Sequence, residues 1–147
     1  MEHCLRTQVA FEAAHRLYDV DTYSEECRNN IHGHSYKVTV YARRSRLNSA
    51  NMVIDFKLLK EIIRKTIEDT YDHSCILRDS DPLAKPIADN CKKVHIVSEN
   101  PTAEWMAEQF FYILNSAIRR NGDPAVTIVQ VDVQETENNV AIYRGDV

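Results

Sequence analysis

Two histidines separated by one glycine stand at the start of an alternating segment, in the stretch CRNNIHGHSYKVTV. Side chains two positions apart on a β-strand point to the same side. His32 and His34 would therefore direct two imidazoles at one point, and Gly33 gives the backbone freedom to bring both rings inward. Imidazole is the commonest metal ligand among side chains, so this spacing indicates a candidate metal site.

A third histidine, His15, ends the alternating segment LRTQVAFEAAH, on the same face as Val9 and Phe11. If the two segments are neighbouring antiparallel strands, the end of the first lies beside the start of the second. Three imidazoles then converge and leave a fourth position open, which is the ligand set of a catalytic zinc site. The alternative is that each histidine is an ordinary core or surface residue.

Cys27 precedes the histidine pair by five residues, in the polar segment YSEECRNN, and we expect this segment to lie over the metal. A nearby cation favours the thiolate, which can then act as a base. The alternative is a structural fourth ligand that closes the site and leaves the thiol inert, and the spacing alone does not decide between the two. We expect the remaining cysteines to be small packing residues.

Two further positions carry groups suited to proton transfer or to substrate binding. Asp72 precedes His73 in the stretch YDHSC, and in a turn such a carboxylate can orient the imidazole and raise its basicity. Glu135 follows three valines on one face of the segment AVTIVQVDVQET. It either emerges into solvent or accepts two N–H donors from a ring such as an aminopyrimidinone.

The composition of the 147-residue chain is that of one domain with a proper core. Its 18 Lys and Arg against 22 Asp and Glu give a net charge of −4, which does not favour nucleic-acid binding. No apolar run is long enough to span a membrane and the first residues lack a signal-peptide pattern. We therefore expect a cytoplasmic protein whose four cysteines are thiols.

The pattern predicts strands and helices in the order strand, strand, helix, helix, strand, strand. Asp55 is expected to cap the first helix and Gly122 to end the second. This order favours an α+β domain over residues 1–147, with a four-stranded antiparallel sheet and both helices on one face. Its open edges favour oligomerisation. The predicted elements are strands at 5–15, 34–44, 125–136 and 140–145 and helices at 56–71 and 101–121, with a short strand at 93–97 as an option.

Six stretches make the chain resemble the family of 6-pyruvoyl-tetrahydropterin and 6-carboxytetrahydropterin synthases: FEAAHRL, HGHSYKV, VIDFKLLK, YDHSCIL, NPTAEWMA and VQETENNVAIYRG, in the expected order. The resemblance covers nearly the whole chain. It implies the tunnelling fold, in which subunits close their sheets into a trimeric barrel and two barrels commonly stack into a hexamer. It also implies the substrate 7,8-dihydroneopterin triphosphate.

The resemblance assigns a role to each candidate residue. It implies that the three histidines bind zinc, that Cys27 is the catalytic base, and that Asp72 and His73 handle the second proton. It further implies that Glu135 anchors the pterin ring and that Thr102 and Glu104 form part of the pocket wall.

The branch within the family stays open at the level of sequence. The spacing C-x4-HGH from Cys27 to His32 lies between C-x3-HGH, usual in the carboxy branch, and C-x5-HGH of the animal pyruvoyl enzymes. FEAAHRL is closer to the carboxy branch, on the route to queuosine, and ETENNV to the pyruvoyl branch. Glu25 or Glu26 is a rival base, as in members that cleave the side chain for folate synthesis. A zinc-stabilised pterin-binding protein without turnover is the non-enzyme alternative.

Overall fold

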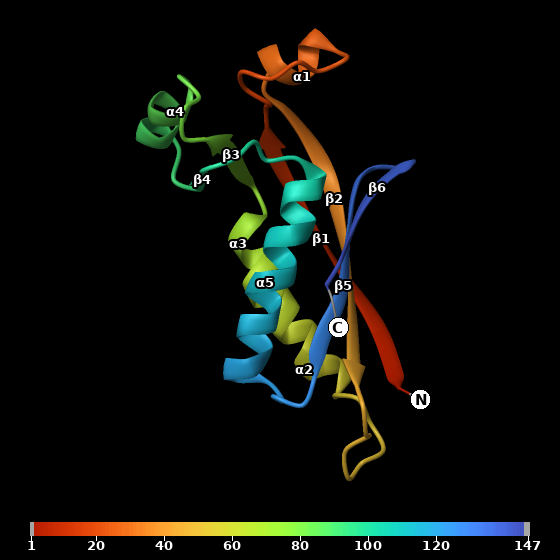
Figure 1. Cartoon of the computed structure of the whole chain (residues 1–147). Helices are drawn as coiled ribbons and strands as arrows, with labels where there is room; N and C mark the ends of the chain where they lie inside the picture. The colour runs from red at the N-terminus through yellow and green to blue at the C-terminus, as the bar shows by residue number, and fades with distance from the viewer. Residues whose placement is uncertain (1, 146–147) are drawn as a thin grey trace.

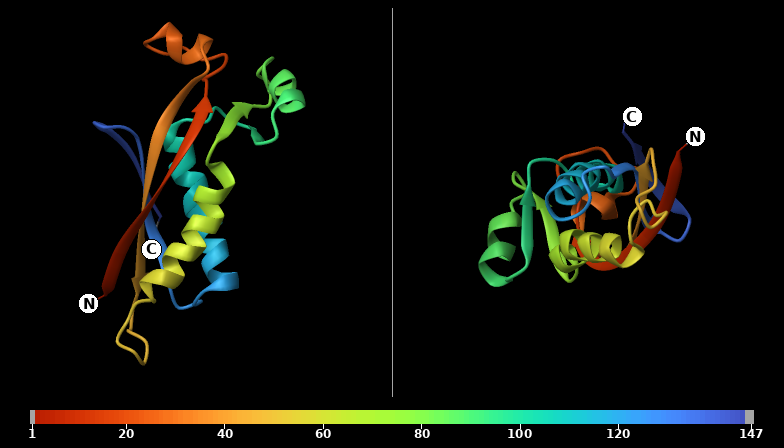
Figure 2. Two further views of the ribbon diagram at one scale, coloured as in Figure 1. Left: turned by 180° about the vertical axis from the view of Figure 1, so that it is seen from behind. Right: turned by 90° about the horizontal axis from the view of Figure 1, so that it is seen from below.

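A twisted sheet covered by helices on one face forms the body of the molecule (Figures 1 and 2). The computed structural model describes residues 2–145. In this part of the chain six strands lie in the order β4-β3-β1-β2-β5-β6. The strands are β1 (His3–His15), β2 (His32–Arg44), β3 (Ser74–Arg78), β4 (Val94–Val97), β5 (Thr127–Thr136) and β6 (Asn139–Arg144).

Two long helical segments pack on the same face of the sheet, as predicted (Figure 2). The first runs from Phe56 to Tyr71 and contains one π-helical stretch between its α-helical ends. Asp55 caps it by accepting N–H bonds from the second and third residues that follow, at 2.8 and 3.3 Å. The helical elements are α1 (Glu25–Asn29), α2 (Phe56–Ile63), η1 (Arg64–Glu68), α3 (Asp69–Tyr71), α4 (Ala84–Asn90) and α5 (Ala103–Asn121).

The prediction of a four-stranded sheet was wrong. The four predicted strands do form an antiparallel unit, β1-β2-β5-β6, but β3 and β4 extend it with parallel pairings. β3 has five residues and no clean alternation of buried and exposed positions, and it pairs with β1 only at Ala13–His15. Such a short strand has little periodic signal. The optional strand near residue 95 is present as β4.

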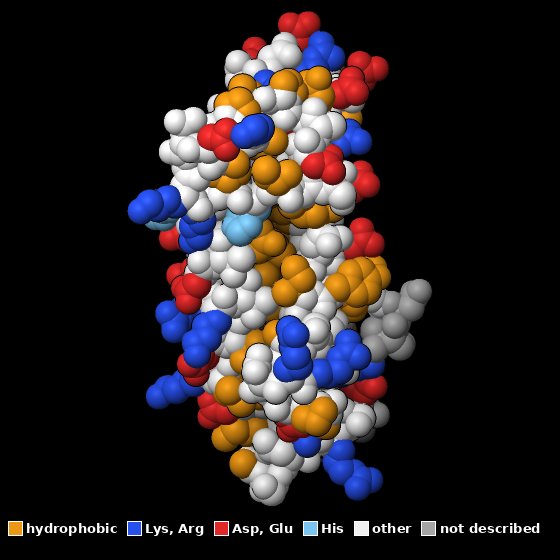
Figure 3. All heavy atoms as spheres, turned by 90° about the vertical axis from the view of Figure 1, so that its left-hand side faces the viewer, with side chains coloured by type: hydrophobic (Ala, Val, Ile, Leu, Met, Phe, Trp, Pro, Cys, Tyr) orange, Lys and Arg blue, Asp and Glu red, His pale blue; other side chains and the backbone are white. Residues whose placement is uncertain are grey.

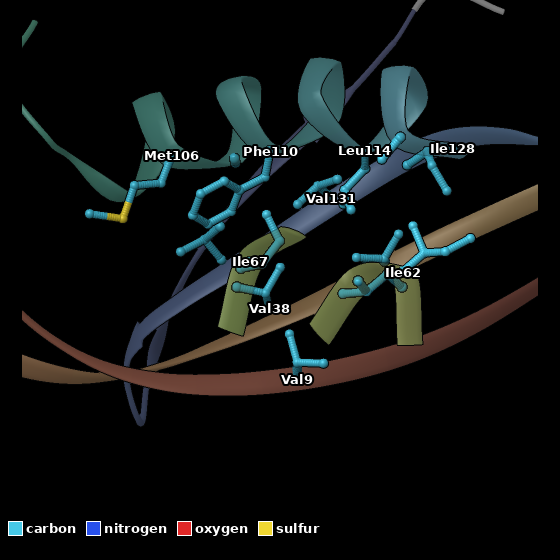
Figure 4. Packing of buried hydrophobic residues seen from close by; sticks show 14 of the residues in the cluster. Val9, Val38, Ile62, Ile67, Met106, Phe110, Leu114, Ile128 and Val131 are labelled. Atoms are coloured by element: carbon cyan, nitrogen blue, oxygen red, sulfur yellow. The ribbon is translucent and has the colours of Figure 1, made fainter. Parts of the chain in front are cut away.

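The core lies between the sheet and the helices α2 and α5 (Figure 4). On β5 the prediction that Val129 shares the buried face was wrong, because Ile128 is buried in its place, whereas Val131 and Val133 are buried as predicted. The register between β2 and β5 shifts there: Tyr41 pairs with Gln130 but Ala42 pairs with Ile128. A bulge of this kind changes which residues face the core.

Charged side chains of both signs are scattered over the face shown in Figure 3, in keeping with the small net charge. Acidic and basic groups also lie together at the α1 end of the molecule, at the top of that view. Within residues 2–145, no helix has both the length and the apolar composition that a bilayer crossing requires.

Candidate metal centre

The pairing of β1 with β2 brings the three predicted histidines together at one end of the sheet. His15 lies directly opposite His32, and Ala13 lies opposite His34. The Nε2 atoms of His15 and His32 are 3.1 Å apart. One ligand atom from each of the three rings lies within 4.8 Å of the other two. Among the described residues, this is the one group of three or more His, Cys, Asp or Glu that meets this spacing.

Backbone carbonyls orient two of the rings. Nδ1 of His15 donates to the Pro101 carbonyl at 2.7 Å, and Nδ1 of His32 donates to the Asn30 carbonyl at 3.0 Å. Because a carbonyl only accepts, the proton stays on Nδ1 and each Nε2 offers a lone pair to the centre of the cluster. Nε2 of His34 is buried without a hydrogen-bond partner in the described part of the chain. An unsatisfied buried nitrogen beside two lone pairs fits a metal ligand set.

Burial keeps two of these imidazoles, those of His15 and His34, in the neutral form that binds metal. It lowers the pKa of His15 to about 4, against the opposing effect of the Pro101 carbonyl, and the charges of His32 and His34 lower this pKa by smaller amounts. Burial also lowers the pKa of His34, against the opposing charge of Glu135. A histidine must be neutral to ligate a metal. The protein therefore presents ligand-competent rings at neutral pH.

Glu135 lies beside the cluster. Its Oε1 is 3.3 Å from Nε2 of His15 and 3.2 Å from Nε2 of His34. The register between β5 and β6 is irregular between Gln134 and Thr136, which is where Glu135 lies. The carboxylate does not simply emerge into solvent, because it is 28% exposed and in contact with two of the rings. It adds negative charge next to three imidazoles, which favours a cation there.

An open pocket of about 490 Å³ adjoins the cluster and shares Glu135 with it. Glu104, in the first turn of α5, lies in the pocket wall together with residues 138–141. Thr102 contributes differently, because its hydroxyl accepts the N–H of Trp105 at 3.1 Å and caps α5. Two carboxylates therefore line a cavity next to a candidate metal, an arrangement suited to a ligand with several N–H donors.

Cys27 lies in the short helix α1 and is half-buried. Its carbonyl accepts the N–H of Leu17 at 2.9 Å, which holds the start and the middle of the connection between β1 and β2 together. Cys27 is not a member of the group of closely spaced ligand atoms formed by the three histidines. Glu25 and Glu26 lie in the same helix, exposed to solvent.

Asp72 and His73 contact each other, as expected of a turn. Nδ1 of His73 lies 2.9 Å from Oδ2 of Asp72, and His73 has a positive φ of 59°. The pair is bound to β1 through Glu12, whose N–H donates to Asp72 at 2.8 Å and whose carbonyl accepts the N–H of His73 at 2.7 Å. The His73 side chain is 82% exposed. In the described part of the chain, hydrogen bonds tie this pair to the edge of β1 and not to the histidine cluster.

Sequence reasoning missed the side-chain contacts that hold the residues following His15 in place. Arg16, next to His15, makes a two-pronged ion pair with the buried carboxylate of Asp81 at 2.6 and 2.5 Å. Asn100 hydrogen-bonds the backbone of Tyr18. Arg16 was visible beside the histidine in FEAAHRL, but nothing in the sequence indicates its partner 65 residues away.

The fold and the site together define an α+β protein with a candidate three-histidine metal centre beside a carboxylate-lined pocket. The sequence matches the family described as 6-pyruvoyl tetrahydropterin synthase over residues 4–146, and the chain belongs to this family. The resemblance inferred from the motifs is therefore confirmed. Solved structures show the same fold. An uncharacterised protein of Wolinella succinogenes has a TM-score of 0.83 at 22% identity, covering 99% of both chains.

Another solved structure, 6-pyruvoyl tetrahydropterin synthase of Caenorhabditis elegans, has a TM-score of 0.73 at 24% identity and covers 99% of this chain and 97% of that one. A curated relative in Aquifex aeolicus, named 6-carboxy-5,6,7,8-tetrahydropterin synthase, is 30% identical over 92% of this chain and 94% of its own. The relative of that name in Helicobacter pylori strain J99 is 33% identical over 80% of this chain. The match spans only 62% of that protein's length. Human 6-pyruvoyl tetrahydrobiopterin synthase is 27% identical over 95% of this chain and 89% of its own.

Proposed function

We propose that this chain is a zinc-dependent lyase that converts 7,8-dihydroneopterin triphosphate to 6-carboxy-5,6,7,8-tetrahydropterin, for queuosine biosynthesis. The observation that carries the proposal is the convergence of three imidazoles beside a pocket lined by Glu135 and Glu104. The choice of the carboxy branch rests on the curated relatives of that name at 30–34% identity, against 27% for the human pyruvoyl enzyme.

The donor set supports zinc. Three imidazole nitrogens with a further open position form the ligand set of catalytic zinc sites, and imidazole suits zinc among the transition metals. When bound, zinc would polarise the side-chain hydroxyls of the substrate and stabilise negative charge that develops on them. The residues that would hold it are His15, His32 and His34.

The other side chains then have roles set by their positions. Glu135 and Glu104 would accept the N–H groups of the pterin ring and fix its orientation in the pocket. Thr102 would support the pocket wall as the cap of α5. Cys27, which lies outside the group of three histidines, would remove a proton as the thiolate, and Glu25 or Glu26 is the alternative base. Asp72 and His73 would transfer the second proton.

An oligomer would explain how the exposed pair Asp72–His73 takes part. The chain leaves two sheet edges to be covered, since β1 pairs with β3 only at its last residues and β6 is an outer strand. β6 also exposes Val140 and Ile142, at 48% and 54%. Pairing of β6 with the open edge of β1 in a second copy would bury these side chains and close a ring of subunits, in a trimer or a hexamer. We propose that the pair from one copy then serves the metal centre of another.

The four cysteines are free thiols. This state is usual in reducing compartments, and it supports the cytoplasm as the site of action.

Incubation of the zinc-loaded protein with 7,8-dihydroneopterin triphosphate, with identification of every product, tests the proposal. The carboxy branch releases triphosphate and acetaldehyde and leaves 6-carboxy-5,6,7,8-tetrahydropterin. A 6-pyruvoyl product without acetaldehyde would assign the pyruvoyl branch, and a hydroxymethyl pterin the folate-type cleavage. Tight pterin binding without any product would instead make the chain a zinc-stabilised binding protein.

A further inference from the structure

The three residues that precede α5 connect its start to both parts of the candidate site. The Pro101 carbonyl orients the ring of His15 at 2.7 Å, and Thr102 caps the helix. The side chain of Asn100 makes two hydrogen bonds to one residue on the other side. Its Oδ1 accepts the N–H of Tyr18 at 2.9 Å, and its Nδ2 donates to the Tyr18 carbonyl at 3.1 Å. One carboxamide thus satisfies both backbone groups of Tyr18, as a neighbouring strand would.

Tyr18 belongs to the segment that carries Cys27, here named the Cys27 loop and defined as residues 16–31. Next to Tyr18, the N–H of Leu17 donates to the Cys27 carbonyl at 2.9 Å. A continuous path of one covalent step and three hydrogen bonds therefore joins Asn100 to the backbone of Cys27. Asn100 and Tyr18 are 82 positions apart, so this path ties the loop to a distant element rather than to its own neighbours.

Arg16, two residues before Tyr18, gives the Cys27 loop one further strong attachment. The Arg16 guanidinium binds Asp81, which is 3% exposed, and also donates to the Asn29 carbonyl at 3.4 Å. In the described part of the chain, the ion pairs in the middle of the loop join residues of the loop itself: Arg28 lies 3.5 Å from Asp21 and 3.3 Å from Glu25. In Figure 1 α1 protrudes from the end of the molecule. The position of Cys27 relative to the cluster therefore depends on two attachments near the start of the loop, at Arg16 and Tyr18.

We propose that Asn100 is a positioning residue, whose carboxamide fixes the Cys27 loop against the same segment that orients His15. This inference rests on the proposed function in one respect, the role of Cys27 as the base. Because the segment contacts both His15 and Tyr18, it sets the distance between the metal ligand His15 and the Cys27 thiol. The Asn100 side chain itself touches neither the His15 ring nor the Cys27 thiol. Pro101 makes its bond to His15 with the backbone, so a change of the Asn100 side chain leaves that contact in place.

Hydrogen–deuterium exchange of the zinc-loaded protein tests the attachment directly. In Asn100→Ala both hydrogen bonds to Tyr18 are lost, and we expect exchange in the Cys27 loop to rise about 30-fold, since each of the two bonds contributes on the order of 1 kcal/mol. Asn100→Asp keeps an acceptor for the Tyr18 N–H but no donor for its carbonyl, and it should give a smaller rise.

The matched control is Asn48→Ala. Oδ1 of Asn48 also accepts two backbone N–H groups, from Ala50 at 2.9 Å and Met52 at 3.0 Å, in a turn at the other end of the sheet. This variant should loosen that turn and leave the Cys27 loop as in the parent protein. Exchange of the Cys27 loop within twofold of the parent in Asn100→Ala would overturn the attachment.

The kinetic test separates positioning from a general structural role. In Asn100→Ala we expect zinc content and KM to stay within twofold of the parent while kcat falls about tenfold, with partial recovery in Asn100→Asp. Loss of zinc from Asn100→Ala, or an unchanged kcat despite a loosened loop, would overturn the positioning role. If the parent protein itself has no lyase activity, the proposed function fails, and the exchange experiment still decides whether Asn100 holds the loop.

Discussion

The histidine cluster and the Cys27 loop are neighbours in sequence, but the fold holds them by different means. The three imidazoles stand on β1 and β2, which pair along their full 13-residue lengths and pack against the core. The Cys27 loop leaves the sheet and is attached mainly through Asn100 and Asp81. Disrupting the cluster requires opening paired strands, whereas the loop can move by breaking a few bonds.

This difference suits the two tasks that we propose. A metal site needs ligands held in a fixed geometry, and strands of a core sheet supply it. Elements that open for substrate come from the less stable parts of a protein. The comparison therefore predicts that metal binding and the reactivity of Cys27 respond to different substitutions.

The largest effect is expected from His34→Ala. It removes one of three ligands from a set in which each Nε2 faces the same point, so zinc affinity should fall more than about 100-fold, beyond the loss typical of supporting residues. Competition with a chromophoric chelator measures it. His95→Ala is the matched control, because that ring bonds the Thr70 carbonyl at 2.8 Å, away from the cluster. Zinc binding by His34→Ala at the parent affinity would remove His34 from the site.

Cys27→Ala should separate the two regions. Zinc content is expected to stay at the parent level while kcat falls about 10²–10⁴-fold, the usual contribution of a general base. Metal analysis and steady-state kinetics on the same preparation provide the measurement. Cys75→Ala is the control, since Cys75 is half-buried in β3 and its pKa is raised by that partial burial. If Cys27→Ala instead loses zinc, the thiol is a ligand and the two regions are one site.

Asp81→Asn tests the attachment of the loop through the stability of the fold. Burial raises the pKa of Asp81, but the Arg16 guanidinium and the Leu83 N–H together outweigh it and hold the pKa below its ordinary value. The unfolded chain then binds the proton more readily, so the pair stabilises the fold above pH about 4 and this contribution is lost as the pH falls through the lowered pKa.

At pH 7, Asp81→Asn should lower the free energy of unfolding by about 3 kcal/mol, because it leaves the Arg16 guanidinium without its charged partner. Urea unfolding at pH 7 and at pH values below 4 measures both effects, and Asp89→Asn, which breaks an exposed pair with Lys85, is the control. Equal sensitivity of Asp81→Asn and the parent protein to acid would show that the pair does not carry the pH dependence.

The smallest of the four effects is expected from Glu135→Gln. A neutral amide cannot accept two N–H donors side by side, so KM for the pterin should rise about tenfold, the value of a hydrogen bond to a charged group. Zinc content should not change, because the three imidazoles remain. Glu137→Gln, in the exposed turn between β5 and β6, is the control. An unaltered KM would place the ring outside the reach of Glu135.

The sequence predicted the histidine cluster because strand period and antiparallel register are strong local rules. His15, His32 and His34 needed only the assumption that two alternating segments pair. The same reasoning missed β3, whose parallel pairing involves three residues of β1, and it missed the bulge that buries Ile128 in place of Val129. Those features depend on contacts between distant segments, which no local period records.

The pair Asp72–His73 shows the same limit of prediction from local sequence. Its internal contact follows from two adjacent residues in a turn and was predicted. Its place at the edge of β1 was not predicted, because it follows from hydrogen bonds to the backbone of Glu12, 60 positions before Asp72. The attachments of the Cys27 loop to Asn100 and Asp81 likewise join residues 82 and 65 positions apart.

The ligands of the bound metal test the central claim most directly. X-ray absorption at the zinc edge of the purified protein should show one zinc per chain with three imidazole nitrogens at roughly 2.0 Å, a further oxygen and no sulfur. A zinc–sulfur distance of roughly 2.3 Å, or fewer than three imidazoles, would contradict a three-histidine centre with a free Cys27 thiol.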